Sequence, residues 1–365
     1  MIIGASVYPR NSPRANRTTE LAKELARQGH DVRLYAVLSD YNYDAFEIEN
    51  NIKVSDIGRV KFATHHKDGK LNNSILFKGI SFFLHKLLEF PDIELMFKIP
   101  KIIKREKDID LLITVAVPYP IHWGAALAKQ RIKSFPKIWV ADCGDPYMGN
   151  KFKKRYFYFK YIEKWFCRSA NYIVIPIEEA KEAYYKEFLN KIVVIPQGFN
   201  NSKLKLSYCD PKNSIPTFAF AGTFYEKFRD PAKLLEYLTT VKRDFKFIIY
   251  TRSRNIVEPF IPKLKDKIEI RDYIPREELI STLSKMDFLL NFENGTTVQS
   301  PSKLIDYAIT KRPILSITSD KFNVDDFENF LNGNYSAKVE IKNIEQYDIK
   351  NVAAKFLFLF QNHYK

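Results

Sequence analysis

The sequence is poor in cysteine, histidine and glycine, and it has no long uninterrupted apolar run. It contains three cysteines, six histidines and twelve glycines in 365 residues. Three scattered cysteines do not make a disulfide framework, and neither cysteine nor histidine shows metal-ligand spacing. No run of 18 or more apolar residues occurs, so we expect no transmembrane helix. The first residues lack the basic start and long apolar stretch of a secretory signal. These absences favour a protein of the reducing cytoplasm.

Positive charge, by contrast, is in excess. The chain has 58 Lys and Arg against 43 Asp and Glu, for a net charge of +15. Such an excess is typical of proteins that meet nucleic acid, anionic lipid or phosphorylated substrates. A compositional bias explains part of it, because Lys, Asn, Ile, Phe and Tyr are all abundant, as an AT-rich coding sequence produces. Charge alone therefore does not choose among these partners.

Strand and helix patterns alternate along the chain in two successive sets. Short apolar runs predict strands at 2–7, 32–38, 111–117, 138–141, 172–175 and 192–195, and again at 217–221, 245–250, 267–270, 288–292 and 314–317. Amphipathic stretches predict helices at 18–28, 231–241, 276–286 and 351–361. A segment rich in Asn, Ser and Lys lies between the two sets, at 200–216. This alternation predicts an α/β protein with two doubly wound domains, each a parallel sheet with helices on both faces.

The most informative segment is 297–317. A Ser-Pro-Ser step at 300–302 opens an amphipathic helix, and Asp306 lies one turn inside it. Free N–H groups and the positive dipole end make a helix start a natural seat for a diphosphate. A carboxylate one turn further on can bind the two hydroxyls of a ribose. The pattern indicates a nucleotide diphosphate, although an ordinary capped helix of a βαβ unit would share it.

The same segment resembles the donor-binding signature of glycosyltransferase family 4. Many members of this family read P-x-K-L-x-E-Y-x-x-x-G-K-P here. Asp306 replaces the usual Glu, and Lys-Arg-Pro at 311–313 replaces Gly-Lys-Pro. The family's first Glu would fall on Val298, so its contact to the sugar would pass to Gln299 or Glu293. The segment 192–200 also resembles the family's crossover between its two domains.

This resemblance implies a GT-B fold, in which two Rossmann-like doubly wound domains face a central cleft. Residues 1–198 would bind the acceptor, 199–345 would bind the nucleotide sugar, and 346–365 would form a helix that packs back on the first domain. The implied activity is a retaining, hexosyltransferase-type sugar transfer to a glycan or lipid-linked acceptor in cell-surface polysaccharide synthesis, without a metal or other cofactor. Two other functions stay open, a nucleotide-sugar 2-epimerase of the same fold and a non-catalytic protein that binds nucleotide sugars or nucleic acid.

The resemblance extends to the start of the second domain. Family members place Arg directly after Gly222 and Lys about six residues later, and Thr223 and Arg229 hold these positions here. Arg229 keeps a cation for the departing diphosphate, with Lys227 as a nearby substitute; a plain helix entry at 229–231 is the alternative. Donor-binding residues implied in this way are Gly222, Thr223, Lys227, Ile274, Gln299, Ser300, Ser302 and Asp306, and the catalytic residues implied are Arg229, Lys303 and Asp145. Arg252, which follows the predicted strand at 245–250, either faces the nucleotide as a further donor-binding residue or is a solvated charge.

Three loops after predicted strands make up the expected acceptor side. The first loop lacks G-x-G-x-x-G, which argues against a dinucleotide site, and its Arg14 and Arg17 either bind a phosphate on the acceptor or lie in a solvated turn. Similar transferases carry D-x-R-D-x-W where this chain has Asp142-Cys-Gly-Asp145. Asp145 would bind an acceptor hydroxyl or take its proton, unless the segment is an Asx turn, and Asp142 is the more structural of the two. His122 matches a family histidine only approximately and could instead lie in the core.

One segment suggests a membrane surface. Residues 151–168 contain seven basic residues, one acidic residue and eight aromatics, and 77–90 is a second apolar and basic stretch. Basic side chains bind anionic head groups while aromatic rings settle at the interface. We therefore expect peripheral attachment to an anionic membrane surface, on the inner face of the cell membrane. A core helix with solvated charges and a single-stranded nucleic-acid site are the alternatives, and no nucleic-acid partner is expected.

Overall fold

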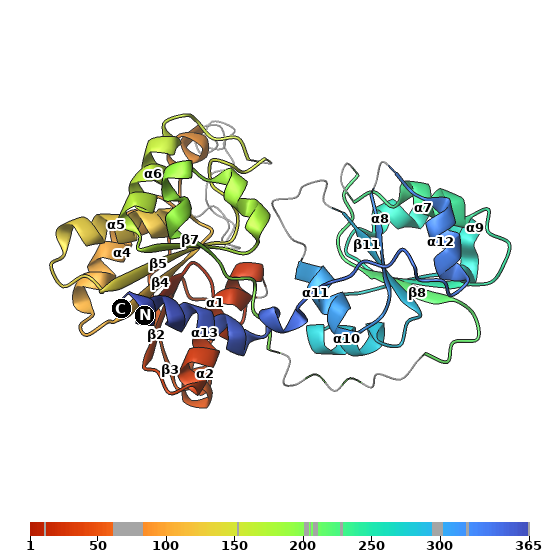
Figure 1. Cartoon of the computed structure of the whole chain (residues 1–365), viewed down its shortest axis with the longest axis horizontal. Helices are drawn as coiled ribbons and strands as arrows, with labels where there is room; N and C mark the ends of the chain where they lie inside the picture. The colour runs from red at the N-terminus through yellow and green to blue at the C-terminus, as the bar shows by residue number, and fades with distance from the viewer. Residues whose placement is uncertain are drawn as a thin grey trace. The chain divides into compact units, whose positions relative to one another are not determined.

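The structure, a computed structural model, describes residues 1–10, 12–60, 83–151, 153–200, 204, 206, 211–226, 229–293, 302–318 and 321–363. The chain divides into two compact units (Figure 1). The first unit is Met1–Asn200 with Gln346–Lys365, and the second is Asn201–Glu345. The chain therefore returns to the first unit for its last helix.

The first unit is built on a seven-stranded sheet in the order β3-β2-β1-β4-β5-β6-β7, and every pair of neighbours is parallel. All residues of β5, which are apolar except for Asp142, are buried, as a central parallel strand requires. β3 escaped the sequence prediction because its residues alternate apolar and polar at the edge of the sheet. The strands are β1 (Ile2–Gly4), β2 (Val32–Ala36), β3 (Ile52–Asp56), β4 (Leu111–Ala116), β5 (Ile138–Cys143), β6 (Tyr172–Ile175) and β7 (Ile192–Val194).

Helices cover both faces of this sheet. One core contains side chains of α4 (Glu94–Arg105), α5 (Pro120–Arg131) and α6 (Phe159–Ser169). The core on the other face contains side chains of α1 (Pro13–Arg27), α2 (Asp44–Asn50) and α13 (Ile349–Asn362). α13 lies beside α1 (Figure 1). Two short 3-10 helices, Glu178–Ala183 and Lys186–Lys191, connect β6 to β7.

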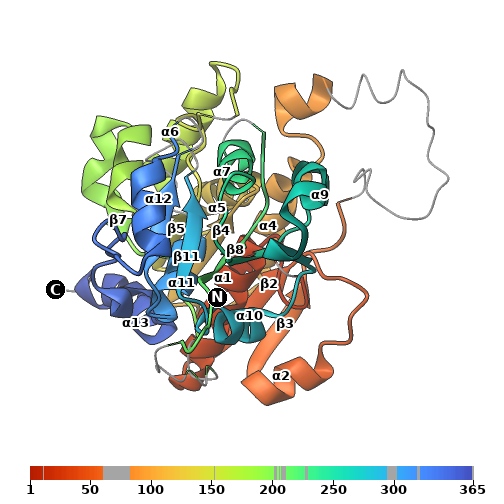
Figure 2. The same ribbon diagram turned by 90° about the vertical axis from the view of Figure 1, so that its right-hand side faces the viewer.

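The second unit repeats the pattern with five parallel strands in the order β10-β9-β8-β11-β12. α7 and α12 line the core on one face of the sheet, and α10 and α11 line the core on the other (Figure 1, Figure 2). The strands are β8 (Thr217–Ala221), β9 (Lys246–Tyr250), β10 (Ile268–Arg271), β11 (Phe288–Phe292) and β12 (Ile314–Ile317). The α-helices are α7 (Ala232–Leu238), α8 (Arg254–Val257), α9 (Ile261–Leu264), α10 (Arg276–Leu283), α11 (Ser302–Ile309) and α12 (Val324–Leu331). The predicted α/β class is confirmed.

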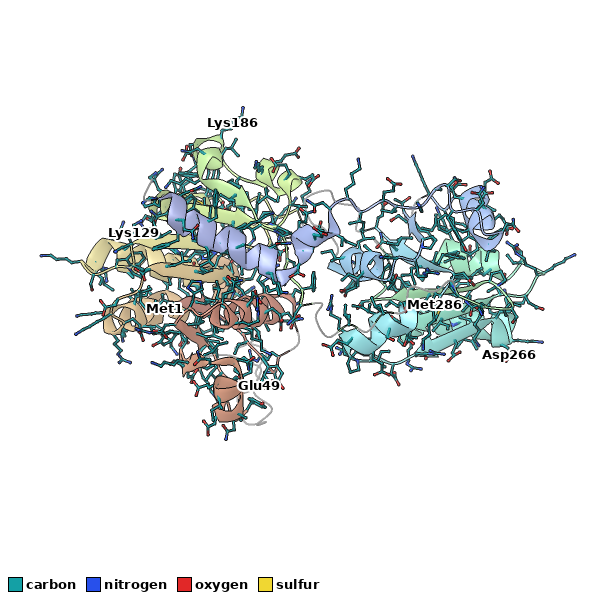
Figure 3. The ribbon with its side chains drawn as sticks, turned by 60° about the horizontal axis from the view of Figure 1, so that its bottom comes forward. Met1, Glu49, Lys129, Lys186, Asp266 and Met286 are labelled. Atoms are coloured by element: carbon teal, nitrogen blue, oxygen red, sulfur yellow. The ribbon has the colours of Figure 1, made fainter. Side chains whose placement is uncertain are left out.

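Each sheet reverses its strand order once, between β1 and β4 in the first unit and between β8 and β11 in the second. In open α/β sheets ligands bind beyond the carboxyl ends of the strands at such reversal points. The loops after β1, β4 and β5 and those after β8 and β11 are therefore the places to look for a site. Charged side chains project from the surface of each unit, among them Glu49, Lys186 and Asp266 (Figure 3).

Candidate functional site

In the second unit, α11 is fastened to the carboxyl end of β8. The buried Tyr307 hydroxyl accepts a hydrogen bond from Ala221 N at 2.7 Å, and Gly222 N donates to Tyr250 O at 2.8 Å. Gly222 thus ends β8 beside α11, at the strand reversal point. The contact also places Asp306, the residue before Tyr307, close to this end of the sheet.

The Asp306 carboxylate is held by an arginine of the neighbouring helix. Arg276, the first residue of α10, places Nε 2.8 Å and Nη2 2.6 Å from Asp306 Oδ1. Both side chains are partly buried, which makes the pair stronger than one in full solvent. The sequence prediction missed Arg276, because it lies 30 positions from its partner and no local pattern marks it. The pair fixes the direction of the carboxylate that was predicted to bind ribose.

Arg229 lies in the loop between β8 and α7, in a fixed position. Tyr225 and Arg229 exchange backbone hydrogen bonds, Tyr225 N to Arg229 O at 3.3 Å and Arg229 N to Tyr225 O at 3.0 Å. Among the described residues, the buried Arg229 Nε has no hydrogen-bond partner. Burial lowers the pKa of Arg229, while Tyr225 and Tyr307 raise it. Arg229 therefore lies in the loop after β8 within electrostatic reach of Tyr307, the α11 residue that contacts β8.

The other residues predicted to bind the donor differ in how exposed they are, and some of them lie outside the described residues. Arg252 is exposed, with its guanidinium 5.4 Å from the centre of the Tyr273 ring. Ile274 packs against the core that contains Tyr307, so a contact to a nucleotide base would use its backbone. Thr223 is half-buried next to Gly222. Lys227, Gln299 and Ser300 lie outside the described residues, as do the side chains of Ser302 and Lys303 in α11.

In the first unit, Arg17 and Asp142 form a buried ion pair. Arg17 Nε and Nη2 lie 2.5 and 2.9 Å from the two oxygens of Asp142, and the residues are 3% and 1% exposed. Arg17 also donates to the backbone carbonyls of Ile195, at 3.1 Å, and Pro196. The prediction that Arg17 binds an acceptor phosphate is corrected, because its donors are used inside the protein. Asp142, predicted on the acceptor side, is likewise a structural residue that joins β5 to α1.

His122 is a core residue. It has no exposed surface, its Nδ1 lies 2.8 Å from Thr114 Oγ1, and its Nε2 lies 3.5 Å from Cys143 Sγ. Burial lowers the pKa of His122 to about 3, so the ring is neutral at physiological pH. The prediction that His122 lies on the acceptor side is therefore corrected. Like Asp142, it is buried and cannot contact a ligand at the surface.

Asp145 and Arg14 do lie at the carboxyl end of the first sheet. Asp145 follows β5 and is half-buried, and its backbone carbonyl accepts a hydrogen bond from the Tyr119 hydroxyl, which fixes the turn. Arg14 is in the first turn of α1 and packs against Gly144, the residue before Asp145. The structure therefore brings together one predicted catalytic residue and one predicted acceptor-side residue.

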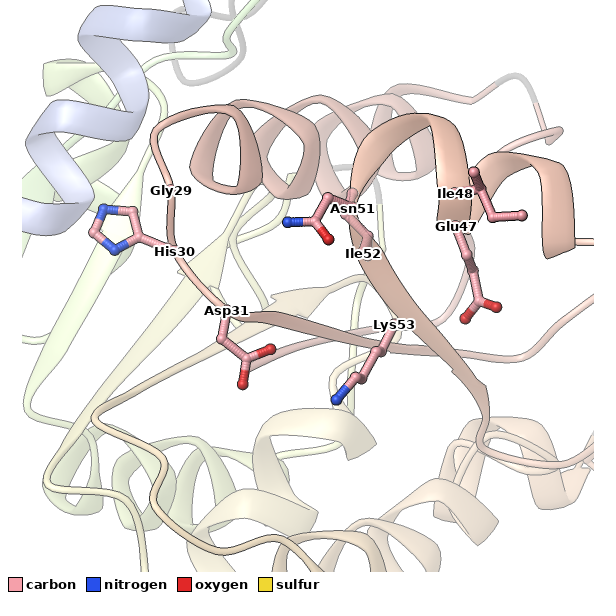
Figure 4. A pocket seen from close by; sticks show the side chains of 8 residues that line it. All are labelled: Gly29, His30, Asp31, Glu47, Ile48, Asn51, Ile52 and Lys53. Carbon is pink, nitrogen blue, oxygen red and sulfur yellow. The ribbon is translucent and has the colours of Figure 1, made fainter.

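A surface hollow lies at the opposite edge of the first sheet (Figure 4). It is lined by Gly29, His30, Asp31, Glu47, Ile48, Asn51, Ile52 and Lys53. Asp31 and Asn51 directly precede β2 and β3, so the hollow lies at the amino ends of these strands. Its position separates it from the loops that follow the strands. No cluster of three or more His, Cys, Asp or Glu suited to a metal ion occurs in the described part of the chain.

This chain is similar to proteins of known family and structure. The profile of Glycosyltransferase Family 4 matches residues 15–203, and the search of curated proteins finds no match. A glycosyltransferase from Rickettsia africae is similar over 99% of this chain and 93% of its own, with 16% identity and a TM-score of 0.59. HepE of Anabaena in complex with UDP is similar over 99% of both chains, with 9% identity and a TM-score of 0.60. UDP-GlcNAc 2-epimerase of Neisseria meningitidis bound to UDP-GlcNAc is similar over 99% and 100%, with 13% identity and a TM-score of 0.58.

Proposed function

This chain belongs to glycosyltransferase family 4 and has the predicted GT-B fold, and from this premise we propose that it is a retaining transferase. It would move a sugar from a nucleoside-diphosphate sugar to a glycan or lipid-linked acceptor, in the synthesis of cell-surface polysaccharide. The second unit would bind the donor and the first unit the acceptor. No metal would be needed.

Arg229 is the observation that carries this proposal. A sugar leaves its donor as negative charge develops on the diphosphate, and a cation fixed in advance stabilises that charge without having to reorganise. Arg229 Nε, which is buried and has no hydrogen-bond partner in the described part of the chain, fits this role in the loop after β8. Lys303 and the backbone amides of Ser300 and Ser302 would complete the diphosphate site. In front-side displacement the leaving phosphate helps to deprotonate the acceptor, so Asp145 would orient the hydroxyl rather than act as a strong base.

Asp306 would bind the ribose of the donor. Its carboxylate is already oriented by Arg276, which lowers the entropy cost of forming a further contact. Two of the similar structures contain UDP or UDP-GlcNAc, which supports uridine diphosphate as the first ligand to test, with guanosine diphosphate as the second.

We expect Asp306→Ala to weaken binding of the nucleoside diphosphate by about 1–3 kcal/mol, because ribose hydroxyls lose a charged acceptor. This corresponds to a change in Kd of about 5- to 150-fold. Isothermal titration calorimetry with uridine and guanosine diphosphate, in the presence of EDTA, measures both the loss and the need for a metal. Arg276→Ala is the matched control, since it removes the orienting partner and leaves the carboxylate, so its loss should be smaller. Absence of heat with both diphosphates in the parent protein would refute the donor site.

The 2-epimerase remains the competing function, because a nucleotide-sugar 2-epimerase shares this fold at comparable similarity. An epimerase acts on the nucleotide sugar alone. Incubation with UDP-GlcNAc in the absence of any acceptor, followed by NMR of the sugar, distinguishes the two functions. Epimer formation without an acceptor would replace the transferase proposal.

The surface around α6 supports an acceptor at a membrane. One side of α6 is buried in the core through Phe159, Phe166 and Cys167. The outward residues of α6 and the segment before it, which we name the α6 surface, combine basic and aromatic side chains. They are Lys151, Lys153, Lys154, Tyr156, Phe157, Lys160, Tyr161 and Arg168. Phe157 is 77% and Tyr161 67% exposed, and such rings bind at a lipid interface. No helix within the described ranges is both long and apolar enough to span a bilayer.

We expect the protein to co-sediment with anionic vesicles, to bind neutral ones weakly, and to be released in part by salt, because each basic residue near an anionic surface adds about 1 kcal/mol. Replacing Lys153, Lys154 and Lys160 with Glu should abolish the preference for anionic vesicles. Arg155 must be kept, since it pairs with Glu89 at 2.8 Å and packs over the Tyr147 ring. The control variant carries three Glu at Lys263, Lys265 and Lys285, which are exposed in the second unit. Equal sedimentation of the parent and the α6 variant would show that this surface does not bind lipid.

A further inference from the structure

We propose that Arg14 and the turn at Gly144 form an anion subsite that binds a phosphate group of the acceptor. The identification of the ligand as an acceptor rests on the proposed function. The anion subsite itself follows from the packing and charge of the first unit.

The guanidinium of Arg14 occupies the space beside Gly144 in which a Cβ atom would lie. A Cβ atom added to Gly144 would lie 1.5 Å from Nη1, 1.9 Å from Cζ and 2.2 Å from Nη2 of Arg14. Gly144 is not among the glycines with positive φ, so the position requires glycine for space and not for backbone conformation. Any other residue would push the guanidinium out of this place.

Among the described residues, none balances the charge of Arg14. Arg14 and Arg17 are one helical turn apart and face the same strand end, but only Arg17 has an acidic partner there, Asp142. Across the residues that the structure describes, no carboxylate forms an ion pair with Arg14, and its buried Nη1 has no hydrogen-bond partner. A buried donor without an acceptor costs free energy, and an anionic ligand would remove that cost.

The start of α1, which carries Arg14, is held against the sheet at the end where its strands finish. α1 packs closely on β1, since a Cβ on Gly4 would lie 2.9 Å from Thr18 Oγ1, and Thr19 Oγ1 accepts a hydrogen bond from Tyr8 N at 2.9 Å. The loop from β1 to α1 borders the strand reversal point between β1 and β4, where ligands bind in such sheets. Arg14 is thus a preorganised cation that a ligand can reach, because the residue stays partly exposed.

A phosphate ester suits this cation better than a neutral hydroxyl does. A guanidinium can donate two parallel hydrogen bonds to two phosphate oxygens, which adds both strength and direction. Asp145, next to Gly144, would then lie beside the sugar that carries the phosphate. The phosphate could belong to a lipid-linked sugar or to a soluble sugar phosphate, which present the same group to Arg14.

The test is calorimetric titration of the full chain with inorganic phosphate. We expect binding to weaken at least tenfold in Arg14→Ala and in Gly144→Ala, which keeps the arginine but displaces it. Arg10→Ala removes an exposed arginine of the same loop and should bind phosphate as the parent does. The titration is made in saturating uridine diphosphate, which fills the proposed donor site, so that inorganic phosphate reports on the first unit alone. Arg254→Ala, at an exposed arginine of the second unit that pairs with Asp272, should also leave this binding unchanged. Phosphate binding that is absent from the parent, or that survives Arg14→Ala, would overturn the subsite.

Two further measurements identify the source of the phosphate and separate the two proposals. If the acceptor is a lipid, dodecyl phosphate should displace inorganic phosphate more strongly than glucose 1-phosphate does. The reverse order indicates a soluble acceptor. Neither compound should displace phosphate in Arg14→Ala. Uridine diphosphate should bind to Arg14→Ala as it does to the parent. If it binds neither protein, the proposed transferase function fails while the phosphate titration still decides the subsite.

Discussion

Arg229→Ala is expected to lower turnover by about 10²–10³-fold, the usual effect of removing one preorganised electrostatic group from a reaction that develops charge. The backbone of Arg229 is held by its two hydrogen bonds with Tyr225, and its buried Nε has no hydrogen-bond partner among the described residues. Its positive charge would stabilise the diphosphate most strongly in the transition state, when the bond to the sugar breaks. Loss of Arg229 should therefore lower kcat more than it lowers the affinity for the nucleotide. Release of the nucleoside diphosphate from the sugar donor, followed over time, measures kcat, and calorimetry measures Kd.

Arg254→Ala is the matched control for this prediction. Arg254 is another arginine of the second unit, but it is exposed and pairs with Asp272 at 2.7 Å, so turnover should stay near that of the parent. Lys227, which lies outside the described residues, offers a second comparison. Intact turnover in Arg229→Ala together with its loss in Lys227→Ala would move the catalytic cation to Lys227.

The second large effect concerns stability and its dependence on pH. Glu163 on α6 has no exposed surface, and burial raises its pKa to about 7, even though hydrogen bonds from Tyr185 and Met148 N and the charge of Arg155 lower it. A carboxyl whose pKa is higher in the folded chain than in the unfolded chain binds more protons when folded. It therefore stabilises the protein below pH 4.5, and this contribution is lost as pH rises from 4.5 to about 7. At 1.36 kcal/mol for each pH unit, the loss is about 3 kcal/mol.

The titration of His122 changes the free energy of unfolding with pH in the opposite direction. Its pKa is lowered by burial from 6.5 to about 3, so the unfolded chain binds more protons and stability rises with pH between 3 and 6.5. The two contributions nearly cancel between pH 4.5 and 6.5 in the parent protein. Removing the titration of Glu163 should expose the contribution of His122.

We therefore expect the free energy of unfolding of Glu163→Gln, relative to the parent, to increase by about 3 kcal/mol between pH 4.5 and 7 and to stay constant above pH 7. Urea denaturation at half-unit steps from pH 4.5 to 8 measures this difference. Glu182→Gln, at an exposed position of the same unit, should follow the parent throughout. If the free energy of unfolding changes with pH in the same way for Glu163→Gln and the parent, Glu163 is ionised in the folded protein over this range.

Much of the fold followed from local patterns in the sequence. The predicted strands at 172–175, 217–221, 288–292 and 314–317 agree residue for residue with β6, β8, β11 and β12. Strands buried on both faces are short continuous apolar runs, and such runs can be recognised without knowing their neighbours. β3 was missed because an edge strand with one wet face has a weaker signal.

The approximate position of the candidate site was also predictable. In a parallel sheet all strands end at the same edge, so residues that follow predicted strands gather there. This argument predicted that Asp145 follows its strand, and the family resemblance predicted the same of Gly222; both lie there in the structure. Arg276 was not found, because its role depends on α10 packing beside α11.

The sequence by itself determined the α/β class, the parallel strands and the loops that carry the site, because each depends on residues that are close together in the chain. Only the tertiary structure decided what each side chain in those loops does. Arg14 and Arg17 are three positions apart in one loop and helix start, and nothing local distinguishes them. Arg17 is neutralised by Asp142, 125 positions away, while Arg14 lies against Gly144 and keeps its charge. The role of a charged side chain depends on which groups surround it in space, and the fold brings those groups from distant parts of the chain.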